Sequence, residues 1–272
     1  MGYRMKKLAP GVTSHPKRGT ENMYIGWAPM PAIDRRFLIG TLPFALAGTA
    51  AVSYGVSSNL SDPGAGSWQT GATHNVTGAW STHPYPMLRM IDETVPGGVR
   101  TVLVVAEGKC SSGLKNDAAQ STPVTASGVL IERKDRQMLE VPPLLDKWQT
   151  PADLSDGDLA RLRAPRVASR GMATLKGAIM DSKCFFGVMR PARGMTHKAC
   201  ASLCIRGGIP PSFWVRDGQG REAVLLLTDR DGGPMPLEIL PLVADPVEAR
   251  GEIVAVDDIL QFRADLSAFH RI

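Results

Sequence analysis

An uncharged stretch of 20 residues near the N-terminus, 37–56, constrains the fold of this chain more than any other feature. At about 1.5 Å per residue, a helix over this stretch reaches about 30 Å, which matches the core of a lipid bilayer. Interspersed glycine, threonine and proline make it only mildly hydrophobic. We predict a single transmembrane helix that is retained as a signal-anchor. The alternatives are cleavage at a small-residue site and a buried hairpin of a soluble protein.

The excess positive charge of the chain lies before this stretch. Residues 1–36 contain seven basic and two acidic residues, which accounts for the net charge of +5 and leaves the rest of the chain neutral. By the positive-inside rule, the N-terminus stays in the cytoplasm and the body lies across the membrane. A neutral body lacks the cationic excess that neutralises phosphates, so we expect no nucleic-acid partner.

The junction from Asp34 to Ile39, which reads DRRFLI, resembles the twin-arginine export signal of bacteria. That signal has a polar residue, two arginines, any residue and then two hydrophobic ones. The resemblance implies export of a folded body. We therefore expect a single-pass protein of the inner membrane whose body lies on the periplasmic side.

The body combines short β-branched runs with many turns. The chain contains 28 glycines and 21 prolines, which favours short elements over long helices. We predict a mainly β fold of two small barrel-like units, with one short helix in the C-terminal unit. The expected domains are a cytoplasmic basic segment over 1–36, the transmembrane segment over 37–56, an extended tether over 57–84, a first β unit over 85–148, a linker over 149–171 and a second β unit over 172–272.

Two octapeptides, 124–131 and 247–254, share the pattern Val-x-Ala-x-Gly-x-aliphatic-aliphatic. A glycine inside a strand often marks a bulge or a sharp bend, which a small five-stranded barrel needs in order to close. The match raises the hypothesis that one barrel unit was duplicated within the chain.

Residues that can bind metals or undergo redox chemistry gather in one stretch of the second unit. Three of the four cysteines fall between Cys184 and Cys204, together with His197. A helix predicted over 197–206, capped by Thr196 and stopped by a Gly-Gly pair, would place His197, Cys200 and Cys204 on one face. Cys184, at the end of the preceding strand, would cover that face.

Three interpretations of this cluster stay open. In an oxidising periplasm, a disulfide would join Cys184 to Cys200 or Cys204, with Cys110 available to the remaining thiol. A metal site of Cys184, His197, Cys200 and Cys204 would hold zinc, copper or an iron–sulfur centre. A redox-active thiol pair is the third. We expect the neighbouring Lys183 and Lys198 to favour the thiolate forms.

The same stretch resembles small exported bacterial β domains of unknown function, of the oligonucleotide/oligosaccharide-binding (OB) barrel type. These domains tend to read Gly-x-Ile-x-Asp-x-x-Cys, then His-x-x-Cys-x-x-x-Cys and Gly. The resemblance covers roughly residues 174–262 and implies a fold and a compartment, but no catalytic residue. The matching residues here are Gly177, Ile179, Asp181, Cys184, His197, Cys200, Cys204 and Gly207 or Gly208.

The sequence contains no glycine-rich phosphate loop, no Gly-x-Ser-x-Gly and no His-Glu-x-x-His. The acidic pairs 229/231 and 257/258 are expected to be solvated at turns. The lack of these motifs favours a chain that is not an enzyme by itself, and an enzyme with thiol–disulfide exchange activity at Cys200 is the third hypothesis after the two that follow. The expected function is a membrane-anchored accessory or assembly subunit of an envelope complex, such as a respiratory one. The alternative is a metal-binding or electron-transfer protein that uses the Cys/His cluster.

Overall fold

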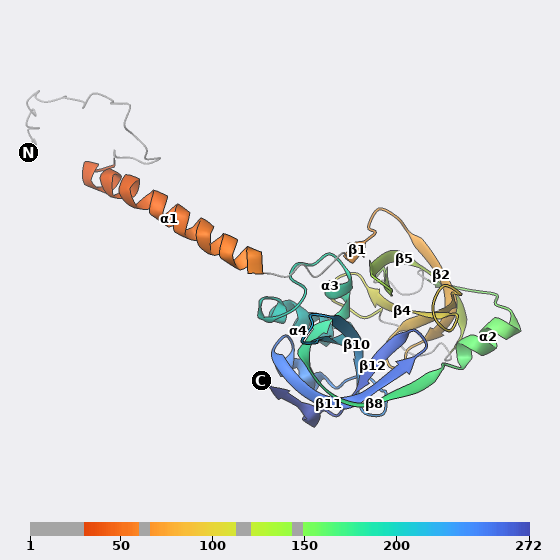
Figure 1. The fold of residues 1–272 in the computed structure, drawn as a ribbon. Coiled ribbons are helices and arrows are strands. Elements are labelled where there is room, and N and C mark those ends of the chain that lie inside the picture. The colour runs from red at the N-terminus through yellow and green to blue at the C-terminus, as the bar shows by residue number, and fades with distance from the viewer. Residues whose placement is uncertain (1–29, 60–65, 113–120, 143–148) are drawn as a thin grey trace, which may run out of the picture. The chain divides into compact units, whose positions relative to one another are not determined.

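The computed structural model in Figure 1 describes residues 30–59, 66–112, 121–142 and 149–272. The chain divides into two compact units, residues 1–62 and 63–272. Most of the predicted cytoplasmic segment, and residues 60–65 of the predicted tether, lie outside the described residues. The unit over 63–272 is called the body below.

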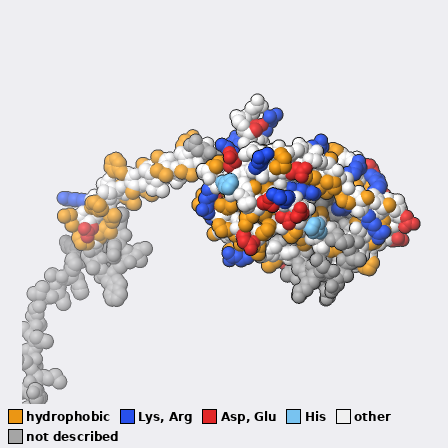
Figure 2. All heavy atoms as spheres, turned by 90° about the horizontal axis from the view of Figure 1, so that it is seen from below, with side chains coloured by type: hydrophobic (Ala, Val, Ile, Leu, Met, Phe, Trp, Pro, Cys, Tyr) orange, Lys and Arg blue, Asp and Glu red, His pale blue; other side chains and the backbone are white. Residues whose placement is uncertain are grey.

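The first unit contains one helix, α1 (Ala32–Asn59), within its described residues. It is long and apolar enough to cross a membrane, and none of its hydrophobic span is buried. Figure 2 shows α1 covered by hydrophobic and uncharged side chains except at its N-terminal end, where charged side chains lie, whereas charges of both signs are interspersed on the visible face of the body. The predicted N-terminal apolar helix is confirmed.

The N-terminal half of the body is a closed five-stranded barrel. Strand β5 pairs with β2 and again with β6, which closes the ring in the order β5-β2-β3-β4-β6. Strands β4 and β6 are parallel, and the other neighbours in the ring are antiparallel. Two short strands, β1 and β7, pair with β5 outside the ring. The strands are β1 (Gly66–Trp68), β2 (His74–Ser81), β3 (Met87–Ile91), β4 (Val99–Ala106), β5 (Pro123–Arg133), β6 (Arg136–Val141) and β7 (Gln149–Pro151).

The C-terminal half repeats this strand order. Its ring runs β8-β9-β10-β12-β11 and returns to β8, with β10 and β12 parallel. The additional strand β13 pairs with β11. The elements are β8 (Val167–Asp181), β9 (Pro211–Arg216), β10 (Glu222–Thr228), β11 (Pro246–Val256), β12 (Ile259–Arg263) and β13 (Phe269–Arg271), with α2 (Asp156–Arg163) before β8, and α3 (Ser182–Phe186), η1 (Met195–His197), α4 (Lys198–Arg206), η2 (Leu237–Leu242) and η3 (Leu266–Ala268) between and after the strands.

The two matched octapeptides occupy equivalent strands, β5 and β11, each the fourth strand of its ring. A Cβ atom at Gly128 would lie 2.4 Å from the carbonyl oxygen of Glu140, and one at Gly251 would lie 2.6 Å from that of Arg263. Both carbonyls belong to the fifth strand. Each glycine therefore lets the fifth strand approach closely, as ring closure requires. Equivalent placement is what an internal duplication demands.

The mainly β fold is confirmed, but two segment boundaries and the number of helices differ from prediction. Residues 66–81 of the predicted tether contain β1 and β2, because Val76 and Trp80 pack into the first barrel. The serine, glycine and threonine residues around them obscure the alternation of apolar and polar residues that indicates a strand. Within the predicted linker, β7 and the start of β8 form strands on either side of α2. The C-terminal half contains two α-helices, α3 and α4, instead of one.

The two barrels share a hydrophobic core. One cluster combines side chains between Tyr85 and Met138 with side chains between Met180 and Ile259. The buried hydroxyl of Tyr85 donates a hydrogen bond to the carbonyl of Leu227 (2.7 Å) and accepts one from the N–H of Met235 (2.9 Å). This pairing satisfies polar groups from both halves, so the body folds as one packed unit.

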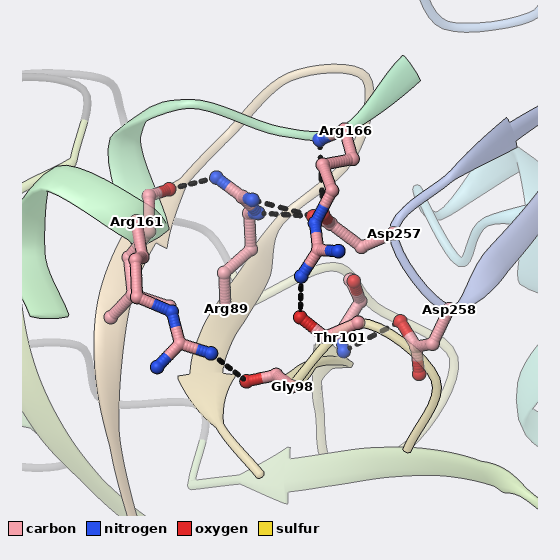
Figure 3. Close-up of polar contacts among 9 residues, drawn as sticks. Arg89, Gly98, Thr101, Arg161, Arg166, Asp257 and Asp258 are labelled. Atoms are coloured by element: carbon pink, nitrogen blue, oxygen red, sulfur yellow. Dashed lines mark hydrogen bonds and ion pairs between the residues drawn. The ribbon is translucent and has the colours of Figure 1, made fainter. Parts of the chain in front are cut away.

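A polar network also joins the barrels, as Figure 3 shows. Arg89 of β3 donates to one carboxylate oxygen of Asp257 through Nε (2.9 Å) and a terminal nitrogen (2.5 Å). The backbone N–H of Thr101 donates to Asp258 (2.9 Å), and burial raises the pKa of this carboxyl. The expectation that these two acids are solvated is wrong, because the turn between β11 and β12 faces the first barrel.

Candidate functional site

Three of the predicted site residues come together. The sulfur atoms of Cys184, Cys200 and Cys204 all lie within 4.8 Å of one another. Cys184 and Cys204 are buried, Cys200 is half-buried, and the sulfur atoms of Cys184 and Cys200 are 3.9 Å apart. All four cysteines are free thiols, and Cys110 is exposed. The disulfide that was one of the three interpretations is not seen, since its sulfur atoms would be about 2.05 Å apart.

Local structure positions each thiol. Strand β8 ends at the buried Asp181, whose carboxylate accepts a hydrogen bond from the N–H of Cys184 (2.8 Å) and so starts α3. Cys200 and Cys204 lie one turn apart on α4, as predicted. Helix α4 begins after His197 and receives no side-chain cap, so the predicted role of Thr196 is wrong.

His197 belongs to a second group around Cys184. Its Nε2 lies 3.1 Å from a carboxylate oxygen of Asp181, and both side chains are buried. Ligand atoms of Asp181, Cys184 and His197 lie within 4.8 Å of one another. Because His197 sits in η1 rather than in α4, the helix-face argument holds for the two thiols but not for the histidine. Cys184 is the member common to both groups.

A lysine that sequence reasoning missed contacts the thiols. The ammonium of Lys109 donates to the sulfur of Cys200 (2.7 Å) and lies 3.6 Å from that of Cys204. Lys183 and Lys198, which were expected in this role, pair instead with Glu140 (2.5 Å) and Asp245 (2.6 Å). No local pattern points to Lys109, because it comes from the loop after β4 of the first barrel.

A hydrogen bond between Cys184 and Cys204 moves the pKa values of these two thiols in opposite directions. The hydrogen bond from Cys184, helped by the charge of Lys109, lowers the pKa of Cys204 to about 7. The same hydrogen bond, together with burial, raises the pKa of Cys184. Near neutral pH a substantial fraction of Cys204 is therefore thiolate, next to the cation of Lys109.

A glycine allows the Lys109 loop to reach α4. The N–H of Ser111 donates to the carbonyl of Gly207 (2.8 Å), and a Cβ atom at Gly207 would lie 1.8 Å from the carbonyl oxygen of Lys109. Gly207 has an ordinary φ of −76°, so only this close approach requires a glycine there. The neighbouring Gly208, at φ +95°, ends the helix.

We predict that Gly207→Ala displaces this loop. Overpacking is expected to lower the free energy of unfolding by about 1–3 kcal/mol, and the departure of Lys109 should raise the pKa of Cys204. Urea unfolding and the pH dependence of thiol alkylation measure the two effects. Gly218→Ala is the matched control, because nothing lies within 4 Å of a Cβ atom there. Equal stability of the two variants would contradict the prediction.

The arrangement favours some chemistries over others. Cysteine, histidine and aspartate form the nucleophile, base and orienting group of thiol hydrolases, but an activated nucleophile needs a depressed pKa and access. Cys184 has a raised pKa and is buried, so it does not meet that requirement. Three converging thiols beside a cation are instead the donor set of a thiolate metal site.

The thiol cluster lies entirely within the body. The cluster is formed by β8, α3 and α4 of the second barrel and completed by one loop of the first. Comparison of the chain with models of known protein families and with curated proteins finds no match.

Proposed function

We propose that this chain is a membrane-anchored accessory or assembly subunit of an envelope complex. In this proposal α1 crosses the bacterial inner membrane once, and the body lies on the periplasmic side. The observation that carries it is the exposure of α1: Phe37, Phe44 and Val52 have 66%, 80% and 67% of their surface exposed. At about 25 cal/mol per Å² of apolar surface, such a helix gains strongly from a lipid environment.

The charge distribution supports the orientation. The net positive charge lies in residues 1–36, before the hydrophobic span, and the body is neutral overall. The paired Arg35 and Arg36 stand directly before that span, as in a twin-arginine signal. We also infer that both barrels are of the OB type, because each is a closed five-stranded ring whose third and fifth strands are parallel.

An open strand edge supports a subunit role. Within the described residues, β8 between Val167 and Lys176 pairs only with β11, because its pairing with β9 begins at Gly177. Residues 167–172 are all exposed, including Val167 and Met172. An unpaired edge offers backbone donors and acceptors to a strand of another protein. The proposed partner is therefore a protein of the envelope complex.

A reporter experiment tests the location. β-Lactamase folds before export and protects a cell from ampicillin only outside the cytoplasm, so we expect a C-terminal β-lactamase fusion to be active and membrane-bound. The double variant Arg35→Lys, Arg36→Lys should abolish activity, while the matched variant Lys6→Arg, Lys7→Arg should retain it. A full-length fusion that accumulates in the cell without protecting it overturns the proposed location.

Purification in mild detergent tests the subunit role. We expect the wild-type chain to co-purify with other envelope proteins in fixed proportion. The substitutions Met172→Glu and Ala168→Pro should each release these partners. A charged side chain and a proline both obstruct the addition of a strand at the open edge. Isolation of the wild-type chain alone from native membranes overturns this role.

A further inference from the structure

We propose that Cys184, Cys200 and Cys204 together bind one divalent metal ion of zinc-like softness as three thiolates. This site lies within the body, and the proposal is independent of the membrane location and partners proposed above.

The spacing of the sulfur atoms fits such an ion. In a tetrahedral site with zinc–sulfur bonds of about 2.3 Å, the sulfur atoms stand about 3.8 Å apart. Cys184 and Cys200 are 3.9 Å apart, and all three sulfur atoms lie within 4.8 Å of one another. Small side-chain movements bring them to coordination distance, whereas a disulfide needs an approach of almost 2 Å.

The charges favour a divalent ion. Three thiolates and one divalent ion have a net charge of −1, which Lys109 cancels through its hydrogen bond to Cys200 (2.7 Å). A neutral assembly suits a site in which Cys184 and Cys204 are buried, because burying a net charge is costly. A monovalent copper ion would leave one negative charge without a partner.

The other candidate cofactors fit less well. An iron–sulfur cluster takes four protein ligands, usually cysteines, and the fourth cysteine, Cys110, is exposed and outside the sulfur group. His197, the fourth predicted ligand, lies outside the group of three sulfur atoms and contacts Asp181 through Nε2 (3.1 Å). In this arrangement the three thiolates bind the ion, a solvent molecule takes the fourth position beside the half-buried Cys200, and His197 orients Asp181 beneath Cys184.

Spectroscopy of the full-length chain tests the ligand number without mutation. The protein is purified in detergent, reduced, freed of metal and titrated with Co²⁺ and then Zn²⁺. We expect one ion per chain, with a cobalt spectrum typical of a tetrahedral three-thiolate site. X-ray absorption of the zinc form should show three sulfur ligands at about 2.3 Å and one lighter atom. No stoichiometric binding, or a coordination sphere with fewer than three sulfur atoms, overturns the proposal.

Isosteric variants identify the ligands. Cys200→Ser and Cys204→Ser should each abolish the three-thiolate spectrum, while Cys110→Ser, the matched control, should leave it unchanged. Lys109→Met should weaken zinc binding about 10–100-fold, as expected for a residue that hydrogen-bonds a ligand, with three sulfur ligands retained. Circular dichroism of each variant verifies folding.

The variant His197→Ala distinguishes a site of three thiolates from the four-ligand site of Cys184, His197, Cys200 and Cys204 that the sequence predicted. If the histidine only orients Asp181, the variant keeps three sulfur ligands and binds cobalt with the same charge-transfer band. Loss of binding in His197→Ala, together with retained binding in Cys200→Ser or Cys204→Ser, overturns the three-thiolate site.

Discussion

Replacing Arg89 by alanine is expected to destabilise the body by about 3–5 kcal/mol, the cost of leaving a buried charge without its partner. The side chains of Arg89 and Asp257 are only 9% and 2% exposed. Arg89 also donates to the carbonyl of Leu162, so its loss removes the bond to α2 as well. Among the described residues, the carboxylate of Asp257 would keep the hydrogen bond from the backbone N–H of Arg166 (3.0 Å). This interaction joins both barrels to the helix between them.

Urea unfolding of three variants isolates the pair. Arg89→Ala alone should be strongly destabilising, and adding Asp257→Asn should recover part of the loss because the unpaired carboxylate is removed. Arg161→Ala is the matched control, since the pair of Arg161 with Glu93 is 42% and 70% exposed. Such exposed pairs contribute about 0–1 kcal/mol. If Arg89→Ala costs no more than Arg161→Ala, the buried pair does not stabilise the body.

Lys183→Met is expected to have an effect of similar size. The ammonium of Lys183 contacts Glu140 (2.5 Å) and donates to the carbonyls of Ala106 (2.7 Å) and Gly108 (2.8 Å). Methionine fills a similar volume but leaves the carboxylate of Glu140, 8% exposed, with the indole N–H of Trp68 (2.8 Å) as its one remaining donor in the described part of the chain. We expect a loss of about 3–5 kcal/mol.

A second substitution shows whether the loss of stability comes from the lost attraction between Lys183 and Glu140 or from the unpaired, buried carboxylate of Glu140. Lys183→Met combined with Glu140→Gln should be more stable than Lys183→Met alone, because the buried carboxylate is then neutral. Lys176→Met is the surface control, since Lys176 and Glu248 are 68% and 38% exposed; it should change stability by about 0–1 kcal/mol. A double variant less stable than the single one would contradict this explanation.

Local patterns predicted several elements correctly. The β-branched runs of the body, among them 100–106, 124–132 and 222–228, form strands, as the predicted mainly β fold requires. Cys200 and Cys204 share a helix face. Local patterns failed for β2, where small polar residues mask the alternation that buries Val76 and Trp80. They also placed His197 on the helix, although it precedes α4.

By itself the sequence determined the apolar N-terminal helix, the mainly β character of the body and the helical spacing of two thiols, because each depends on neighbours within a few residues. Only the tertiary structure decided which groups meet. Lys109 and Cys200 are 91 residues apart in the chain, and Arg89 and Asp257 are 168 apart. Those contacts form because two closed barrels pack against each other, and the register of that packing is set by side-chain shapes across the interface, which no local period encodes.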